Sequence, residues 1–128
     1  SRVSIGTCGH IFSRISKLSM KSDRVYLEQI LESITKTEQF VSGLDKDQFL
    51  KDLKTQSAVI MQLALIGELA KRVSDTTRST INVPWKEIAG FRDRAIHVYY
   101  QIDLAVAWDT VTLDLKPLRE ALQKYLGA

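Results

Sequence analysis

The stretch TQSAVIMQLALIGELAKRV, residues 55–73, decides the fold class of this chain. Its apolar residues recur at steps of three and four, as on one side of an α-helix, and leave almost no wholly polar face. They are Ala58, Val59, Met61, Leu63, Leu65, Ile66, Leu69, Ala70 and Val73. A helix that is apolar nearly all round must be covered on several sides. The segment therefore predicts a helical bundle, completed by the same chain or by a partner subunit.

The residues before this central segment predict two further helices. The spacing of apolar side chains indicates a helix over residues 25–41, for which Gly43 is a suitable stop. A short helix is predicted over residues 45–53, with three apolar side chains facing inward: Phe49, Leu50 and Leu53.

The residues after the central segment also have helical spacing. Residues 74–83 are dense in Ser and Thr and predict a loop, and Pro84 is suited to the first turn of the next helix. Asp103 can cap a further helix, which Pro117 kinks or restarts. Apolar positions continue through Trp85, Ile88, Phe91, Ile96, Leu104, Ala107, Trp108, Val111, Leu115, Leu118, Leu122, Tyr125 and Leu126. Because no alternating strand pattern appears, we expect an all-α protein.

Composition places the chain among single, compact domains. Its 128 residues are 45% hydrophobic and 26% charged, enough to bury a core without a metal or a disulfide. The single cysteine, Cys8, excludes an internal disulfide and fits a reducing cytoplasm. No apolar run approaches the roughly 20 residues that cross a bilayer. We therefore expect a soluble, cytoplasmic protein.

The net charge of +3 is unevenly distributed along the sequence. Residues 1–21 hold four basic and no acidic side chains, whereas the other 14 basic residues face 15 acidic ones. The body therefore offers little long-range attraction for a polyanion. Any RNA bound by it must be recognised by a local cluster, for which Arg92 and Arg94 are the candidates.

The composition changes at Met20, after which acidic residues begin and Asp23 is suited to cap a helix. We therefore expect residues 1–19 to be a basic extension, flexible or foreign to the native domain, and residues 20–128 to form one domain. Cys8 and His10 within the extension are expected to be inert.

The segment FRDRAIHVYY, residues 91–100, concentrates the polar chemistry of the chain in the pattern Arg-x4-His-x-Tyr. At about 100° per residue, Arg92 and Tyr99 align to within about 20° on a regular helix, whereas Arg92 and His97 lie about 140° apart. For both to touch one phosphate, the arginine must curl round, the helix must distort, or two copies must pool their residues. Pooling would supply two imidazoles, one as base and one as acid.

Such a site could cleave RNA without a metal. His97 would take the proton of the ribose 2′-hydroxyl, and Arg92 would stabilise the charge building on the phosphoryl oxygens. Asp93 lies four residues before His97 and can orient its imidazole. The spacing alone equally allows a structural Asp93 to His97 hydrogen bond and a surface ion pair at Arg92.

Gly67 and Glu68 are unusual within an apolar helix. In one interpretation, Gly67 permits close helix packing and Glu68 is solvated. In the other, Glu68 points toward Arg92 and supports it through a charge-assisted hydrogen bond.

A matching series of residues resembles the HepT family of the HEPN superfamily over residues 20–126. The series is Ile66-Gly67-Glu68, Val83 to Ile88 with Pro84 and Trp85, Arg92-x4-His97-x-Tyr99, Trp108, and Leu113-x-Leu115. The resemblance implies an up-and-down bundle of about four to five helices that forms homodimers. It also implies a metal-independent endoribonuclease with no cofactor, in which Arg92 and His97 are catalytic and Arg92, Arg94 and Tyr99 contact RNA.

The biological role that the resemblance implies is that of the toxin in a toxin–antitoxin pair. The family's partner is a minimal nucleotidyltransferase antitoxin, which transfers AMP from ATP to the motif tyrosine, here Tyr99. The added phosphate would repel RNA from the neighbouring site. The residue after the motif arginine is commonly Asn in the family and is Asp93 here, so weaker activity or a shifted pH dependence is expected.

Two other functions remain compatible with these residues. The bundle could be a non-catalytic binding module that serves as substrate or scaffold for a nucleotidyltransferase, in which case Tyr99 matters and His97 is dispensable. Alternatively, the polar segment could only stabilise a helical dimer. The sequence does not indicate which RNA would be cut, whether a tRNA or an mRNA.

Overall fold

The computed structural model describes residues 8–91, 93–94 and 104–127, with side chains from residue 22 onward. This part of the chain is built from helices and contains no strand, so the all-α prediction is confirmed. None of the helices described combines the length and apolarity that crossing a membrane requires.

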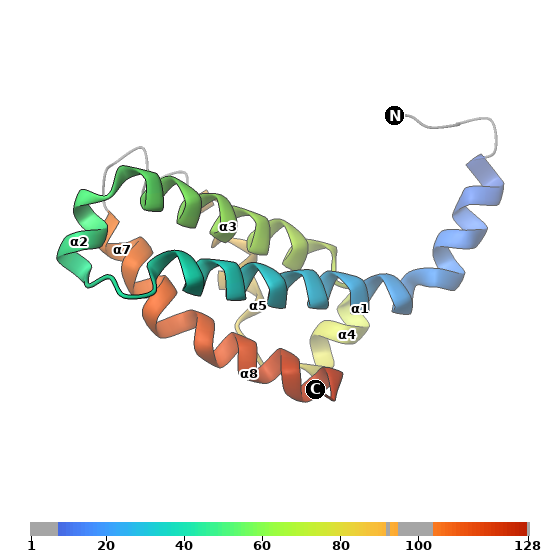
Figure 1. Cartoon of the computed structure of the whole chain (residues 1–128). Helices are drawn as coiled ribbons and strands as arrows, with labels where there is room; N and C mark the ends of the chain where they lie inside the picture. Colours follow the sequence, from blue (N-terminus) through green and yellow to red (C-terminus); the bar gives the residue numbers. More distant parts are fainter. Residues whose placement is uncertain (1–7, 92, 95–103, 128) are drawn as a thin grey trace.

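The first half of the chain is a pair of antiparallel helices, α1 (Cys8–Val41) and α3 (Leu53–Arg72), joined through the short α2 (Lys46–Lys51) (Figure 1). α1 ends where predicted, since Gly43 takes the left-handed conformation with φ of +79° that glycine adopts without strain. Asp45 then caps α2, and its carboxylate and Gln48 form a reciprocal capping box. Asp52 caps α3 by accepting from the Thr55 amide at 3.0 Å.

The second half folds back along this pair. Two short helices, α4 (Asp75–Thr80) and α5 (Trp85–Ala89), follow α3, and a final rod comprises α7 (Leu104–Asp109), the π-helical turn η2 (Thr110–Asp114) and α8 (Leu115–Leu126). In Figure 1 the rod runs beside α1, and its α7 end also contacts α2 and α3. An ion pair between Arg119 and Glu38 joins α8 to α1.

The core lies between α1, α3 and α8 and is closed by α5. The largest contribution comes from α3, as its sequence predicts. The most deeply buried apolar side chains are Leu27, Ile30, Ile34, Phe49, Val59, Ile66, Val73, Leu115 and Leu122. At the end where α2 meets α7, the Phe49 and Trp108 rings lie 5.3 Å apart between centroids.

Asp23 does not cap a helix as predicted, because α1 already begins at Cys8. Asp23 lies inside α1 and is only 5% exposed. Its carboxylate accepts hydrogen bonds from the Ser74 amide (3.0 Å), the Ser74 hydroxyl (2.5 Å) and the Thr77 hydroxyl (2.6 Å). Burial raises the pKa of Asp23, but the bonds from Ser74 and Thr77, with the nearby Arg78, outweigh it and leave that pKa below its ordinary value of 3.8.

The prediction of a loop over residues 74–83 is partly wrong, because part of this stretch forms a helix that Asp23 supports. Ser74 caps α4, which runs over six residues of that stretch, and the Asp23 carboxylate holds this cap against α1. A run of Ser and Thr gives little apolar periodicity, so the sequence pattern gave no sign of this turn of helix.

Several side chains predicted to face inward are exposed. Leu50 is 39% exposed, Leu53 76% and Tyr125 44%, although Phe49 is fully buried as predicted. On the central helix α3, Met61 is 65% and Leu65 43% exposed, so the described residues leave one face of this helix uncovered.

The two prolines lie near departures from regular helix. The helix predicted to start at Pro84 ends at Ala89, with Gly90 as its C-cap, and helical turns resume at Phe91, Asp93 and Arg94. Pro117 lies in the first turn of α8, which begins two residues before it, so a helix restarts close to the predicted position. Pro117 has no N–H to donate to the carbonyl four residues earlier, and the wider π turn η2 directly precedes α8.

Candidate functional site

The loop before α5 is fixed by Trp85, and this fixes the start of the segment that carries the Arg-x4-His-x-Tyr motif. The Trp85 indole N–H donates to the carbonyls of Arg78 and Ile81, each at 3.0 Å. Ile88 and Phe91 are buried, 3% and 4% exposed, and α5 packs on α3. The motif thus begins one residue after a side chain anchored in the core.

Arg94 is folded back over this anchored side chain. Its guanidinium donates to the Glu87 carbonyl at 3.3 Å and lies 5.0 Å from the centroid of the Phe91 ring, within cation–π range. The Arg94 amide bonds to the Gly90 carbonyl at 2.9 Å, which continues the helix past the Gly90 break. Arg94 nevertheless remains exposed, so its cationic head can meet a ligand.

The other predicted site residues are only partly covered by the described structure. Arg92, His97 and Tyr99 lie outside the described residues, as does the predicted cap Asp103. Asp93 is described and exposed. The pairing of Asp93 with His97 stays a prediction.

Glu68 is about half exposed at 42% and accepts a hydrogen bond from Lys71 Nζ at 3.3 Å, one turn along α3. Gly67 beside it is buried. The proposed bond from Glu68 to Arg92 involves a residue outside the described part and stays a prediction.

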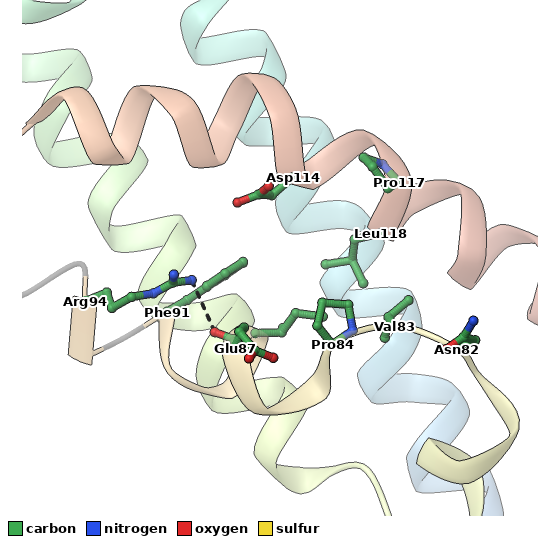
Figure 2. Close-up of a pocket in the computed structure, with 10 residues that line it drawn as sticks. Asn82, Val83, Pro84, Glu87, Phe91, Arg94, Asp114, Pro117 and Leu118 are labelled. Carbon is green, nitrogen blue, oxygen red and sulfur yellow. Dashed lines mark hydrogen bonds between the residues drawn. The ribbon is translucent and has the colours of Figure 1, made fainter.

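A groove of about 310 Å³ opens between the α5 region and the junction of η2 with α8 (Figure 2). Its lining is Asn82, Val83, Pro84, Glu87, Ile88, Phe91, Arg94, Asp114, Pro117 and Leu118. Figure 2 shows Pro84, Glu87, Phe91 and Arg94 on one side and Asp114, Pro117 and Leu118 on the other. The floor is apolar, and the charged groups lie at the rim. The groove includes Phe91 and Arg94, the residues that flank Arg92 and Asp93 in sequence.

Asp114 and Pro117 were not predicted as site residues. They lie more than twenty positions beyond Phe91, and only the packing of the final rod beside α5 brings them to the groove. Asp114 is the last residue of the π turn η2 and is exposed. π turns recur at functional sites in proteins, so η2 points to this part of the structure. No pattern in the sequence predicts a π turn here.

Comparison with known proteins finds a family and several relatives that match most of this chain. The family model described as ribonuclease HepT-like matches residues 30–125. A Thermococcus cleftensis protein named "Probable ribonuclease HepT" is 40% identical over 81% of this chain and 96% of its own length. A protein of Caldanaerobacter subterraneus named as a candidate RNase is 36% identical over 82% of this chain and 98% of its own.

A relative from Methanocaldococcus jannaschii, also named as a candidate RNase, is 38% identical over 84% of this chain and 93% of its own length. No solved structure matches the chain significantly. The match to the family model begins at Ile30 in α1 and ends at Tyr125 in α8. It therefore includes both walls of the groove and the whole Arg-x4-His-x-Tyr motif. The chain belongs to the ribonuclease HepT-like family.

Proposed function

We propose that this protein is a metal-independent endoribonuclease, the toxin of a toxin–antitoxin pair, and that it acts as a homodimer. The observation that carries the proposal is that Arg92-x4-His97-x-Tyr99 falls inside the stretch that matches the ribonuclease HepT-like family. The relatives named as ribonucleases, which align with most of this chain, support the same activity.

The proposed reaction uses the ribose itself as nucleophile. His97 takes the proton of the 2′-hydroxyl, and the 2′-oxygen attacks the adjacent phosphorus. The bond from phosphorus to the 5′-oxygen breaks, which leaves a 2′,3′-cyclic phosphate and a 5′-hydroxyl once the leaving oxygen takes a proton. That proton comes from the second imidazole of the dimer. Arg92 stabilises the negative charge on the phosphoryl oxygens, where a planar guanidinium can donate two hydrogen bonds at once.

The described surroundings of the motif support a role in binding RNA. Asp93 and Arg94 are both exposed, so both side chains can contact a ligand. Arg94 is anchored by Phe91 and the Glu87 carbonyl, which lowers the entropy lost when its guanidinium meets a phosphate or a base. We therefore keep Arg94 as an RNA contact beside Arg92 and Tyr99.

The test is cleavage of total RNA and of tRNA by the purified protein in the presence of EDTA. We expect His97→Ala and Arg92→Ala to lower the rate by at least about a hundredfold, the scale of losing a general base or an oxyanion donor. His10→Ala is the matched control, since it removes the other histidine of the chain. Cleavage that persists in His97→Ala would contradict the mechanism. A folded, unmodified wild type without activity would favour the non-catalytic binding module.

We further propose that the partner is a minimal nucleotidyltransferase antitoxin that modifies Tyr99. The Tyr99 oxygen would attack the α-phosphorus of ATP, so that pyrophosphate leaves and the phenolic proton passes to a base. The bound AMP would add negative charge beside Arg92 and repel RNA.

Intact mass after incubation with the nucleotidyltransferase and ATP tests this step. Additions in steps of one AMP should appear on the wild type and on Tyr100→Phe, the neighbouring tyrosine, but not on Tyr99→Phe. Additions that remain in Tyr99→Phe would show that another residue is the acceptor.

A further inference from the structure

We propose that the groove between α5 and the η2–α8 junction is a base-binding subsite that selects guanine next to the scissile phosphate. This inference rests on the proposed ribonuclease function for its RNA ligand. It does not follow from the motif, because the groove is formed by residues outside Arg92, His97 and Tyr99.

The shape of the groove fits a flat aromatic ring. Its volume of about 310 Å³ is at the lower end of small-molecule sites and accommodates one nucleobase with part of its ribose. The apolar floor includes Phe91 and Ile88, and two exposed prolines line opposite sides of the groove, Pro84 on the α5 side and Pro117 on the α8 side. Prolines and a buried phenyl ring are rigid, so little conformational entropy is lost when a base enters.

The charges at the rim disfavour a phosphate in the groove itself. Two carboxylates, Glu87 and Asp114, line it against one guanidinium, that of Arg94. A phosphate would be repelled by both acids, whereas a neutral base with N–H groups can donate to them. The phosphate therefore belongs outside the groove, and the base belongs inside it.

Guanine satisfies these rim groups better than the other bases. Its N1–H and N2–H are adjacent donors that a carboxylate such as Asp114 accepts together, and its O6 and N7 accept from an arginine such as Arg94. Adenine and cytosine present a ring nitrogen acceptor beside their amino group, which would face the carboxylate lone pairs. Uracil presents two carbonyls around one N–H and meets the same repulsion.

The groove is also close enough to the motif to hold a neighbouring nucleotide. Phe91 lines the groove and is bonded to Arg92, and consecutive Cα atoms are about 3.8 Å apart. A base bound in the groove therefore contacts the residue that directly precedes the motif, and we expect its phosphate to border the motif. The subsite would determine which nucleotide borders the cut.

Binding of 5′-mononucleotides to the ¹⁵N-labelled wild-type protein, followed by NMR, tests the subsite without requiring cleavage. We expect GMP to bind about tenfold more tightly than AMP, CMP or UMP, with shifts concentrated at residues 82–88, Phe91 and 114–118. IMP, which lacks only the N2 amino group, should bind several-fold more weakly than GMP. In Asp114→Asn the difference between GMP and IMP should disappear.

Asp109→Asn is the matched control, since Asp109 is exposed on the same rod and does not line the groove. It should bind all five nucleotides as the wild type does. Equal binding of the four standard nucleotides, shifts elsewhere on the surface, or an unchanged preference for GMP in Asp114→Asn would each overturn the subsite.

Sequencing of the cleaved ends separates this proposal from the ribonuclease function. If the wild type cleaves RNA and guanine is enriched at one fixed position beside the cut, Asp114→Asn should lose that enrichment while it still cleaves. Cleavage with no base preference would remove the subsite and leave the ribonuclease intact. Selective GMP binding by a protein that cuts no RNA would support the groove and contradict the ribonuclease.

Discussion

Asp23 joins parts of the chain that are distant in sequence. Its residue type is suited to helix capping, as predicted, but it assists the cap of α4, 51 residues away, instead of starting its own helix. The pattern of the sequence could not show this, since the partner of a capping carboxylate is fixed by tertiary packing. A buried carboxylate is stable here because each of its oxygens accepts hydrogen bonds.

We expect Asp23→Ala to lower the free energy of unfolding by about 2 kcal/mol, because three hydrogen bonds to a charged acceptor are lost. The donor groups of Ser74 and Thr77 then lose their acceptor. Urea denaturation followed by circular dichroism measures this change. Asp75→Ala is the control, since Asp75 is 98% exposed and pairs with Arg78 only at the surface. It should cost less than about 1 kcal/mol. Equal losses would contradict the proposed role of Asp23.

The lowered pKa of Asp23 makes part of this stability dependent on pH. The carboxyl is harder to protonate in the folded chain, so its contribution is present above the unfolded pKa of 3.8 and is lost as the pH falls through the lower folded pKa. In Asp23→Asn we expect a shallower loss of stability below about pH 4. Some loss should remain, because the pKa of Asp52 is also lowered, by hydrogen bonds from Thr55.

Asp93 is the position at which this sequence departs from the pattern that its family resemblance led us to expect. We predict that Asp93→Asn raises the rate of RNA cleavage and moves the acidic limb of its pH profile to lower pH. The amide no longer stabilises a protonated His97 and no longer repels the RNA phosphate. Asp47→Asn, on an exposed residue of α2, should change neither quantity. An unchanged profile in Asp93→Asn would show that the two side chains do not interact.

At the scale of whole elements, the sequence predicted the long helices and the short α2, but it missed α4 and the π turn η2. The helix of residues 55–73 and the stop at Gly43 follow from apolar periodicity and from the backbone freedom of glycine, and both are confirmed. α4 and the π turn η2 have no such signal, because α4 depends on the distant Asp23 and η2 lies directly before the turn that holds Pro117, which cannot donate a backbone hydrogen bond. The exposure of Leu53 was missed because periodicity shows a face but not what covers it.

The capping box of α2 allows a prediction at this scale. We expect Asp45→Ala to lower the free energy of unfolding by about 1 kcal/mol, since the Gln48 amide loses its side-chain acceptor at the start of a six-residue helix. Asp47→Ala, in the first turn of the same helix, should cost only a few tenths of a kcal/mol. Thermal unfolding of the two variants side by side measures the difference. Equal melting temperatures of the two variants would show that the capping box of α2 does not stabilise the protein.

At the scale of the whole molecule, only part of the candidate site could be predicted from the sequence. The motif segment could be found from residue types and spacing, but the groove beside it required the fold, since Asp114 reaches it from a different helix. The exposed Met61 and Leu65 on α3 leave an apolar face that the described chain does not cover. This face and the wide angle between Arg92 and His97 on a regular helix both favour the proposed homodimer.

Mixing the wild type with an inactive variant tests whether the active site is shared. If one cleft uses His97 of both chains as base and acid, a heterodimer of wild type and His97→Ala lacks one imidazole and is inactive. When equal amounts of the two are unfolded and refolded together, random pairing leaves about a quarter of the dimers fully wild type, so the rate should fall to about a quarter of that of the same total amount of wild type. The two proteins refolded separately and then combined should keep about half of that rate. A rate of about half in a mixture that contains heterodimers would place each active site within one chain.

The Asp23 network also bears on the order in which the molecule assembles. α1 and α3 are joined through the short α2 and can pair early as a helical hairpin, whereas the Asp23 to Ser74 bonds close a loop of 51 residues. The network lies at the end of that hairpin away from α2, so its opening releases α4 and leaves the hairpin paired. In native-state hydrogen exchange, the Ser74 amide should therefore open more readily than amides in the middle of α3.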